Sequence, residues 1–164
     1  MTILLKNKHT LVVDDFKFKC CVGNKGLTFK KREGDKKTPM GVYNIGNLYF
    51  RKDRLLKPET KLKCIEIKKN MIWCDDVNYP KSYNKLVKTL IKARHEKLYR
   101  KDHKYDLLIP IEYNSHNPVV GFGSCIFLHL TKNYKPTAGC IAVNKKDLLI
   151  ILKLINKKTK IKIS

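Results

Sequence analysis

Hydrophobic and polar residues alternate in short runs through the first half of the chain, and turn residues separate these runs. Along 62–68, Ile65 and Ile67 fall on one side of an extended segment, while Cys64 and Glu66 fall on the other, which is the period of a strand. Residues 70–75 are expected to pair with this strand as a hairpin, and 82–94 show some helical character. Further strands are expected at 3–8, 10–19 and 41–45.

The last third of the chain carries longer apolar runs, which predict buried strands at 105–111 and 124–131. A turn at 133–139, a short strand at 140–143 and a helix should follow. Asn144 is the expected N-cap, with Asp147 three residues later. The body of this helix is apolar nearly all round, so we expect one buried helix over about 144–156. A final strand is expected at 159–164.

Several strands around few helices indicate a mainly-β or α+β fold. The 164 residues contain no repeat or linker, so we expect one domain over residues 1–164. The longest apolar run, 148–152, is far shorter than the roughly 18 residues of a membrane helix. Residues 1–8 lack the apolar stretch of a secretory signal, so the sequence by itself favours the cytoplasm.

Charge is the unusual feature of the composition. Lys and Arg number 36 against 14 Asp and Glu, a net charge of +22, and such a field attracts polyanions. The basic residues are scattered from Lys6 to Lys162, and no aromatic–basic nucleic-acid signature accompanies them. We interpret the charge as a solvated surface with non-specific attraction to polyanions. A basic binding module for nucleic acid or another anionic polymer is the alternative.

Six cysteines are present, and without a visible signal peptide free thiols are the expected state. Neither a CxxC pair nor the His/Cys spacing of a zinc site occurs, so no metal and no cofactor are expected. Five of the cysteines lie in apolar or strand-like contexts typical of small buried side chains. Cys140 differs from these five because of its neighbours.

A cysteine nucleophile requires a nearby base and backbone N–H groups that hold an oxyanion. His129 lies near the end of the apolar run 124–131, and Cys140 follows eleven residues later, directly after Gly139. Two adjacent strands joined by such a loop would bring these side chains together. The start of the helix at Asn144 would also favour a thiolate that faced it. On residue types alone, an unreactive core cysteine and core histidine remain the alternative.

Three segments resemble the L,D-transpeptidase catalytic domain, the YkuD-like family, in its compact single-domain branch. They are GSCIFLH at 123–129, PTAGCIAV at 136–143 and KREGDKKTPMG at 31–41. Residues 73–87 and 98–114 also fit, so the resemblance covers roughly residues 20–150 in the family's order.

This resemblance implies a β-sandwich of mixed sheets, a monomer, and action on peptidoglycan or muropeptide stem peptides in the cell envelope. Cys140 takes the position of the nucleophile, which forms a thioester at the L-centre of a tetrapeptide. His129 takes the position of the general base, and the N–H groups of Gly139 and Cys140 that of the oxyanion hole. An amine acceptor then resolves the thioester. If water resolves it instead, the enzyme is an L,D-carboxypeptidase with the same site.

The chain departs from the broader family pattern around the nucleophile. Many members have Ser-His-Gly-Cys followed by x-Arg, whereas this chain has Thr137-Ala138-Gly139-Cys140 without the arginine. His129 is therefore the only nearby base expected. The substrate carboxylate must be held from elsewhere, and the candidate substrate-binding residues are Arg32, Arg94, Thr137 and His116.

Overall fold

The computed structural model describes residues 1–89 and 91–164, and it confirms the mainly-β expectation. Most strands are short and are joined by tight turns. One helix, α1 (Lys145–Leu154), is found among the described residues. The strands are β1 (Thr2–Asn7), β2 (Thr10–Val13), β3 (Phe16–Cys21), β4 (Leu27–Thr28), β5 (Thr38–Pro39), β6 (Gly41–Asn44), β7 (Leu48–Phe50), β8 (Cys64–Glu66), β9 (Ile72–Cys74), β10 (Leu86–Val87), β11 (His95–Lys97), β12 (Leu107–Pro110), β13 (Phe127–Leu130), β14 (Ile141–Val143) and β15 (Lys160–Ile163).

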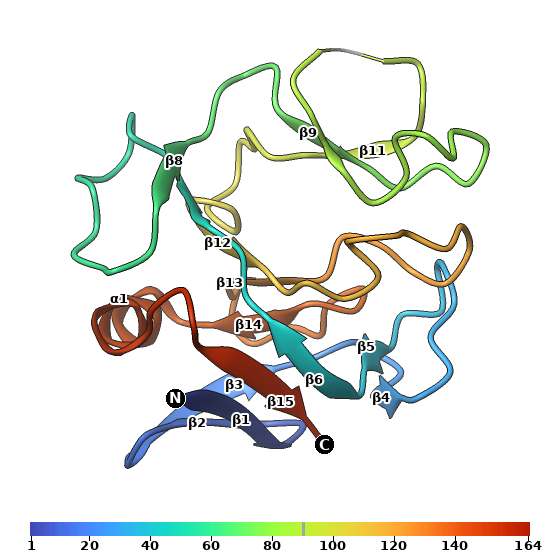
Figure 1. Ribbon diagram of the computed structural model, residues 1–164. Coiled ribbons are helices and arrows are strands. Elements are labelled where there is room, and N and C mark those ends of the chain that lie inside the picture. Colours follow the sequence, from blue (N-terminus) through green and yellow to red (C-terminus); the bar gives the residue numbers. More distant parts are fainter. Residues whose placement is uncertain (90) are drawn as a thin grey trace.

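The larger sheet is mixed and has the order β6-β15-β1-β2-β3-β14-β13-β12-β7-β8. Strands β6 and β7 follow one another in the chain but lie far apart in this order, so the sheet curls. An antiparallel bridge between Ile45 and Ile111 closes the curl, and Gly46 N–H donates to the Pro110 carbonyl at 2.8 Å. Figure 1 shows the resulting layers, with β1 to β3 and β15 at the bottom and β12 to β14 above them.

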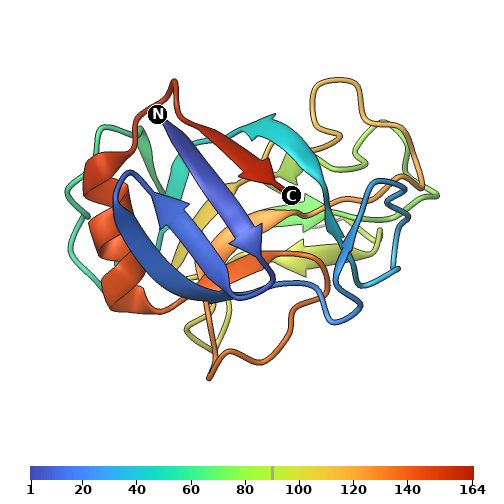
Figure 2. The same cartoon turned by 90° about the horizontal axis from the view of Figure 1, so that it is seen from below.

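The main hydrophobic core lies inside the curled sheet. Its members include Ile3 of β1, Leu128 of β13 and Ile161 of β15, all fully buried. Helix α1 lies along one side of the sheet (Figure 2) and contributes Leu148, Ile151 and Leu152 to the core. In the described parts of the chain, no helix has the length and apolar character needed to cross a membrane.

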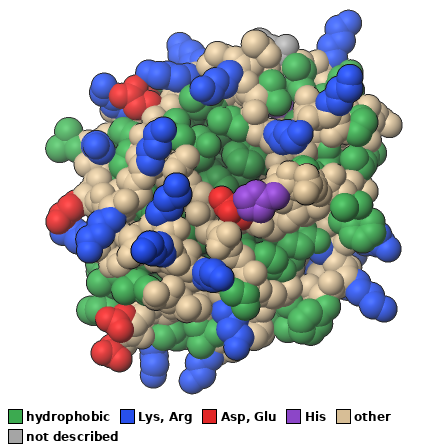
Figure 3. Space-filling view, viewed as in Figure 1, with side chains coloured by type: hydrophobic (Ala, Val, Ile, Leu, Met, Phe, Trp, Pro, Cys, Tyr) green, Lys and Arg blue, Asp and Glu red, His purple; other side chains and the backbone are tan. Residues whose placement is uncertain are grey.

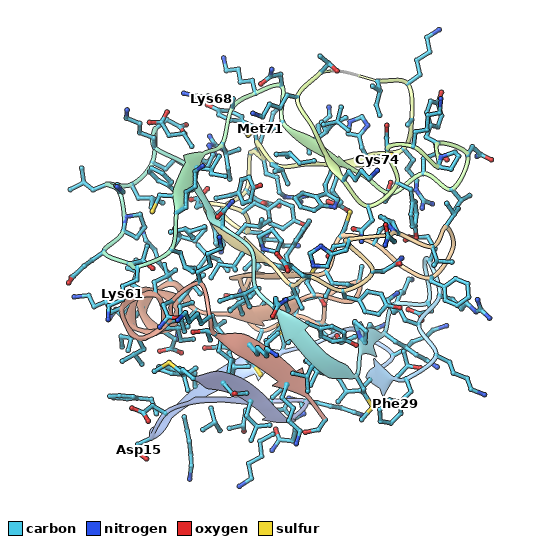
Figure 4. The ribbon with its side chains drawn as sticks, viewed as in Figure 1. Asp15, Phe29, Lys61, Lys68, Met71 and Cys74 are labelled. Atoms are coloured by element: carbon cyan, nitrogen blue, oxygen red, sulfur yellow. The ribbon has the colours of Figure 1, made fainter. Side chains whose placement is uncertain are left out.

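A second, smaller cluster lies on the other face of β12 and β13. It combines Leu108, Phe127 and Cys140 with Tyr49, Tyr105 and other apolar residues. A small sheet with the order β10-β9-β11 covers it; Met71, directly before β9, and Cys74, the last residue of β9, are labelled in Figure 4. Strands β13 and β14 therefore separate two differently built faces, and this separation positions the site described below.

Several local expectations were wrong. The predicted strand 10–19 is a hairpin, because the chain turns at Asp14, which has a φ of 54°, and Asp15 lies at the periphery (Figure 4). The predicted partner of 70–75 was also wrong, since β8 pairs with β7 and β9 pairs with β10 and β11. The expected helix at 82–94 contains β10 instead; residue 90 lies outside the described residues.

The C-terminal helix is confirmed, with one correction. Asn144 is the N-cap and accepts a hydrogen bond from Asp147 N–H at 2.8 Å, as predicted. The helix is buried on one face only: Ile150 is 42 % exposed and Lys153 points to solvent, where it pairs with Glu59. Apolar residues therefore occur on more sides of the helix than the one side that packs against the core.

Candidate active site at the β13–β14 edge

Strands β13 and β14 lie side by side and parallel, with Leu128 opposite Ile141 and His129 opposite Ala142. Successive side chains of a strand point to opposite faces. His129 therefore points to the face that Phe127 also occupies, and Cys140, the residue before β14, points to the same face. The chain thus brings the two candidate catalytic side chains to one face of two adjacent strands.

A cavity of about 470 Å³ opens on this face, and both Cys140 and His129 line it. They are 7 % and 5 % exposed, so each is buried but borders the cavity. Aromatic Tyr105 packs edge-on against the His129 ring, with centroids 5.2 Å apart. The thiol is therefore not sealed under aliphatic side chains, although it is largely withdrawn from solvent.

The Cys140 thiol is held by backbone groups. Its Sγ donates to the Cys125 carbonyl at 3.1 Å and accepts from Phe127 N–H at 3.4 Å. Cys125 has a φ of 54°, an uncommon conformation for a residue other than glycine. Burial raises the pKa of Cys140 to about 12, while the Phe127 hydrogen bond and Lys31 act to lower it. The resting sulfur is thus a protonated thiol.

The His129 imidazole is held in one tautomer. Its Nδ1 lies 2.8 Å from the Leu130 carbonyl, which can only accept, so Nδ1 carries the proton and Nε2 carries a free lone pair. Burial lowers the pKa of His129 to about 4, so the ring is neutral at pH 7. Among the described residues, no hydrogen bond joins the ring to the Cys140 thiol. Each group is therefore neutral at rest, which is not the state of a thiolate–imidazolium ion pair.

Ala138 and Cys140 each present a backbone N–H without an acceptor among the described residues. Gly139 N–H donates to Thr137 Oγ1 at 3.1 Å, and the same hydroxyl donates to the Cys140 carbonyl at 2.6 Å. Gly139 has a φ of +149°, and a Cβ there would lie 2.9 Å from the Lys37 carbonyl oxygen. Only glycine fits this turn, which leads directly into Cys140 at the cavity.

The helix start does not face the thiol. Helix α1 begins at Lys145, beyond β14, so about three strand residues, or roughly 10 Å of chain, separate its N-terminus from Cys140. Asn144 borders a different cavity. The expectation that the helix dipole stabilises a Cys140 thiolate is therefore wrong.

Lys31 is a site residue to which sequence reasoning gave no role. Its side chain is 3 % exposed, and its Nζ donates to Asp35 Oδ1 at 2.6 Å and to the Arg32 carbonyl at 2.7 Å. Although burial acts to raise it, the pKa of Asp35 is held below its usual range by hydrogen bonds from Lys31 Nζ and from the Arg32 and Lys37 backbone N–H groups. The Lys31 stem packs on Gly123, where a Cβ would lie 2.8 Å from its Cγ. The KREGD segment at 31–35 was the available signal.

The four candidate substrate-binding residues lie in different places. Thr137 and Arg94 line the cavity with the thiol. Arg94 is already paired, with its Nε 3.1 Å from Asp75 Oδ1. Arg32 stacks over the Phe122 ring at 4.4 Å and does not line the cavity. His116 borders a second cavity, where its Nε2 lies 3.4 Å from Glu112 Oε2.

The cavity carries charges of both signs. Its acidic residues are Glu33, Asp75 and Glu96. Glu33 accepts from Ser124 Oγ at 2.7 Å and from the Tyr83 hydroxyl. Its basic residues include four lysines that form no ion pair within the described parts of the chain: Lys36, Lys104, Lys132 and Lys135. No group of three or more metal-ligating side chains occurs among residues 1–89 and 91–164.

One comparison with known proteins identifies a family for the chain. The family model YkuD, described as the L,D-transpeptidase catalytic domain, matches residues 1–163. No curated protein and no solved structure matches the chain significantly.

Proposed function

Since the chain belongs to the L,D-transpeptidase catalytic-domain family, we propose that it is a cysteine acyltransferase acting on peptidoglycan stem peptides, with Cys140 as nucleophile. One observation carries this proposal. Cys140 and His129 lie on the same face of adjacent parallel strands and border the same cavity, and the Nε2 lone pair of His129 has no other partner among the described residues. An unreactive core pair would not need a shared cavity.

The neutral resting pair favours proton transfer that accompanies attack. As the substrate carbonyl approaches, the Cys140 thiol leaves the Cys125 carbonyl and His129 Nε2 takes its proton while Sγ bonds to carbon. The oxygen of the tetrahedral intermediate gains the negative charge, and Cys140 N–H is a free donor for it. The C–N bond to the terminal D-amino acid then breaks, and His129 returns the proton to the leaving nitrogen. An incoming amine resolves the thioester by the reverse steps.

Lysines supply the charge that the missing family arginine would otherwise provide. Arg94 is engaged by Asp75 and Arg32 lies outside the cavity, so neither is free to hold a substrate carboxylate. Lys104 is close enough to His129 to act on its pKa, and Lys132 and Lys135 lie on the loop between the two catalytic residues. These lysines are therefore the proposed carboxylate-binding groups, replacing our expectation for Arg32 and Arg94.

The decisive experiment is intact-protein mass spectrometry after incubation with a tetrapeptide stem. The wild-type chain should gain the mass of the acyl tripeptide, and Cys140→Ala should gain nothing. Cys64→Ala, which removes a part-buried thiol outside the cavity, is the matched control and should acylate normally. An adduct that survives Cys140→Ala would contradict the proposal.

Product analysis then separates the two acceptors. With an added amine acceptor, a cross-linked or exchanged product identifies a transpeptidase. Tripeptide alone under the same conditions identifies an L,D-carboxypeptidase that uses the same thioester.

A further inference from the structure

A second cavity, of about 310 Å³, lies beside the catalytic one and shares Ile126 as a wall with it. Its lining comes from three parts of the fold: the β6–β7 connection at Gly46 and Asn47, the small sheet at Trp73, and the loop after β12 at Glu112. Figure 3 looks onto the molecule from the view of Figure 1 and shows hydrophobic side chains flooring a hollow, with a histidine beside an acidic side chain at its edge. The proposed acyl transfer does not use this cavity.

Aromatic rings form much of its wall. Trp73 packs edge-on against Tyr49 and Phe127, with centroids 6.4 Å and 5.3 Å apart, and all three residues line the cavity. The Trp73 indole N–H is fixed on Asn84 Oδ1 at 3.0 Å. These contacts hold the rings in place, so the cavity has a preformed aromatic wall.

Polar groups without partners surround the rings. Neither the Tyr49 hydroxyl nor the Asn47 amide forms a hydrogen bond with the described residues. Ser115 Oγ is a buried side-chain oxygen without a partner in those same residues, and Ser115 borders this cavity. Ser115 Oγ is sealed from solvent, so it is not open to a ligand. The Tyr49 hydroxyl and the Asn47 amide are two unpaired positions beside the aromatic wall, and they are suited to a ligand with hydroxyl or amide groups.

The charge of the cavity excludes a strongly ionic ligand. In a chain of net charge +22, its charged lining is confined to Lys85, Glu112 and the Glu112-paired His116. Lys85 Nζ is turned to the Lys81 carbonyl at 3.0 Å. The catalytic cavity, in contrast, carries seven Lys or Arg side chains. The second cavity is thus locally close to neutral on a basic protein.

We propose that this second cavity binds an uncharged saccharide ring, the N-acetylated sugar to which the stem peptide is joined. The part-exposed Trp73 ring packs on a C–H face of the sugar, and the Tyr49 and Asn47 groups hydrogen-bond its hydroxyls or acetamide. The identity of the sugar rests on the proposed function, since that function places the stem peptide in the neighbouring cavity. The shared wall at Ile126 lets one muropeptide occupy both cavities.

Trp73 makes the proposal directly testable, because it is the only tryptophan in the chain. Titration of the Cys140→Ala protein with chitobiose, an uncharged disaccharide of N-acetylglucosamine, should give a saturable change in tryptophan fluorescence that is insensitive to salt. Tyr49→Phe and Asn47→Ala should each weaken binding by about two- to tenfold, the loss of one hydrogen bond. Tyr79→Phe, which removes an exposed phenol outside the cavity, should bind like its parent.

The outcomes separate this proposal from the catalytic one. Absence of a saturable change, or a change that Tyr49→Phe and Asn47→Ala leave intact, would overturn the saccharide site even if Cys140 acylates normally. Chitobiose binding by a protein that forms no acyl adduct would keep the saccharide site and remove the catalytic assignment. Faster acylation by a disaccharide tetrapeptide than by the free tetrapeptide, with the advantage lost in Tyr49→Phe, would connect the two cavities.

Discussion

The two faces of the β13–β14 pair are made from alternate residues of the same short strands, yet they border different surroundings. On one face Leu128, Leu130, Ile141 and Val143 are at most 2 % exposed and belong to the main core. On the other face the imidazole and the Cys140 thiol border a charged cavity. Strand periodicity therefore places a packed core and a cavity-lining surface on opposite sides of the same strands.

Two cysteines sharpen this comparison. Burial raises the pKa of both Cys20 and Cys140 to about 12, so thiol acidity does not distinguish them. Cys20 lies in the main core, whereas Cys140 shares a cavity with His129 and follows a turn that only Gly139 fits. A base with a free lone pair and access for a substrate distinguish the candidate nucleophile from the structural thiol.

The largest effect is expected from removing the base. His129→Gln deletes the Nε2 lone pair while keeping an amide that can donate to the Leu130 carbonyl. General-base catalysis typically contributes 10²- to 10⁴-fold, so the acylation rate should fall by about that factor. The measurement is the rate of acyl-enzyme formation by mass spectrometry, with folding monitored by circular dichroism.

His103→Gln is the matched control. It also removes an imidazole that contacts a backbone carbonyl, that of Thr131 at 2.9 Å, but His103 lies outside the catalytic cavity. Its acylation rate should equal that of the wild type. Equal rates for His129→Gln and wild type would remove the functional difference between the two faces.

The next effect tests the supporting face. Leu128 lies between Phe127 and His129 in the sequence, but its side chain is fully buried in the main core on the opposite face. Leu128→Ala should lower the free energy of unfolding by about 2–5 kcal/mol, while the acylation rate per folded molecule stays close to normal. Denaturant unfolding measures the first and active-site titration the second. Leu56→Ala, at a position that is 92 % exposed, should change neither.

The sequence predicted the elements that carry strong apolar runs or a local cap, including the strands at 105–111, 124–131 and 159–164, but it did not predict which strands pair with one another. The Asn144 cap and α1 were found because the capping hydrogen bond spans three residues. Residues 86–87 were misread as helical because their strand exists only through pairing with Trp73 and Ile72. The partner of 62–68 was missed because β8 pairs with β7, and no local pattern selects that partner.

The residues of the candidate site also fall into those that the sequence indicated and those that depend on distant contacts. Cys140, His129 and Gly139 were candidates from their spacing and from the resemblance, and they stay candidates that the experiments above test. The contact of the Cys125 carbonyl with the Cys140 thiol was not foreseeable, because it depends on a loop fifteen residues earlier in the chain. Lys31 lies in the KREGD segment, but its packing on Gly123 depends on a distant loop. The paired state of Arg94 likewise depends on Asp75, which lies nineteen residues earlier in the chain.

Acid should lower the free energy of unfolding through protonation of His129 in the unfolded chain. Burial lowers the pKa of His129 to about 4 in the folded chain from 6.5, so the unfolded chain binds more protons between these values. The free energy of unfolding therefore falls as pH falls through this window. Between about pH 7 and pH 4.5, wild type should lose about 2–3 kcal/mol more than His129→Gln. Urea unfolding of both proteins at both pH values measures this difference.

Carboxylates also titrate in this range, but they are common to both proteins and cancel in the comparison. The Cys140 thiol does not contribute, because its pKa of about 12 lies far above the window. Parallel losses of stability in wild type and His129→Gln would contradict a buried, neutral imidazole.

The smallest effect concerns the turn that carries the nucleophile. Gly139→Ala and Gly34→Ala both place a side chain at positive φ, +149° and +74° respectively. At Gly34 the added Cβ meets nothing within 4 Å, whereas at Gly139 it would lie 2.9 Å from the Lys37 carbonyl oxygen. Gly139→Ala should therefore cost about 1–2 kcal/mol more in unfolding free energy and should also slow acylation, because Cys140 N–H must shift with the turn. Equal losses of unfolding free energy in the two variants would mean that the backbone at Lys37 moves away without strain. The turn at Gly139 would then be no more constrained than the exposed turn at Gly34.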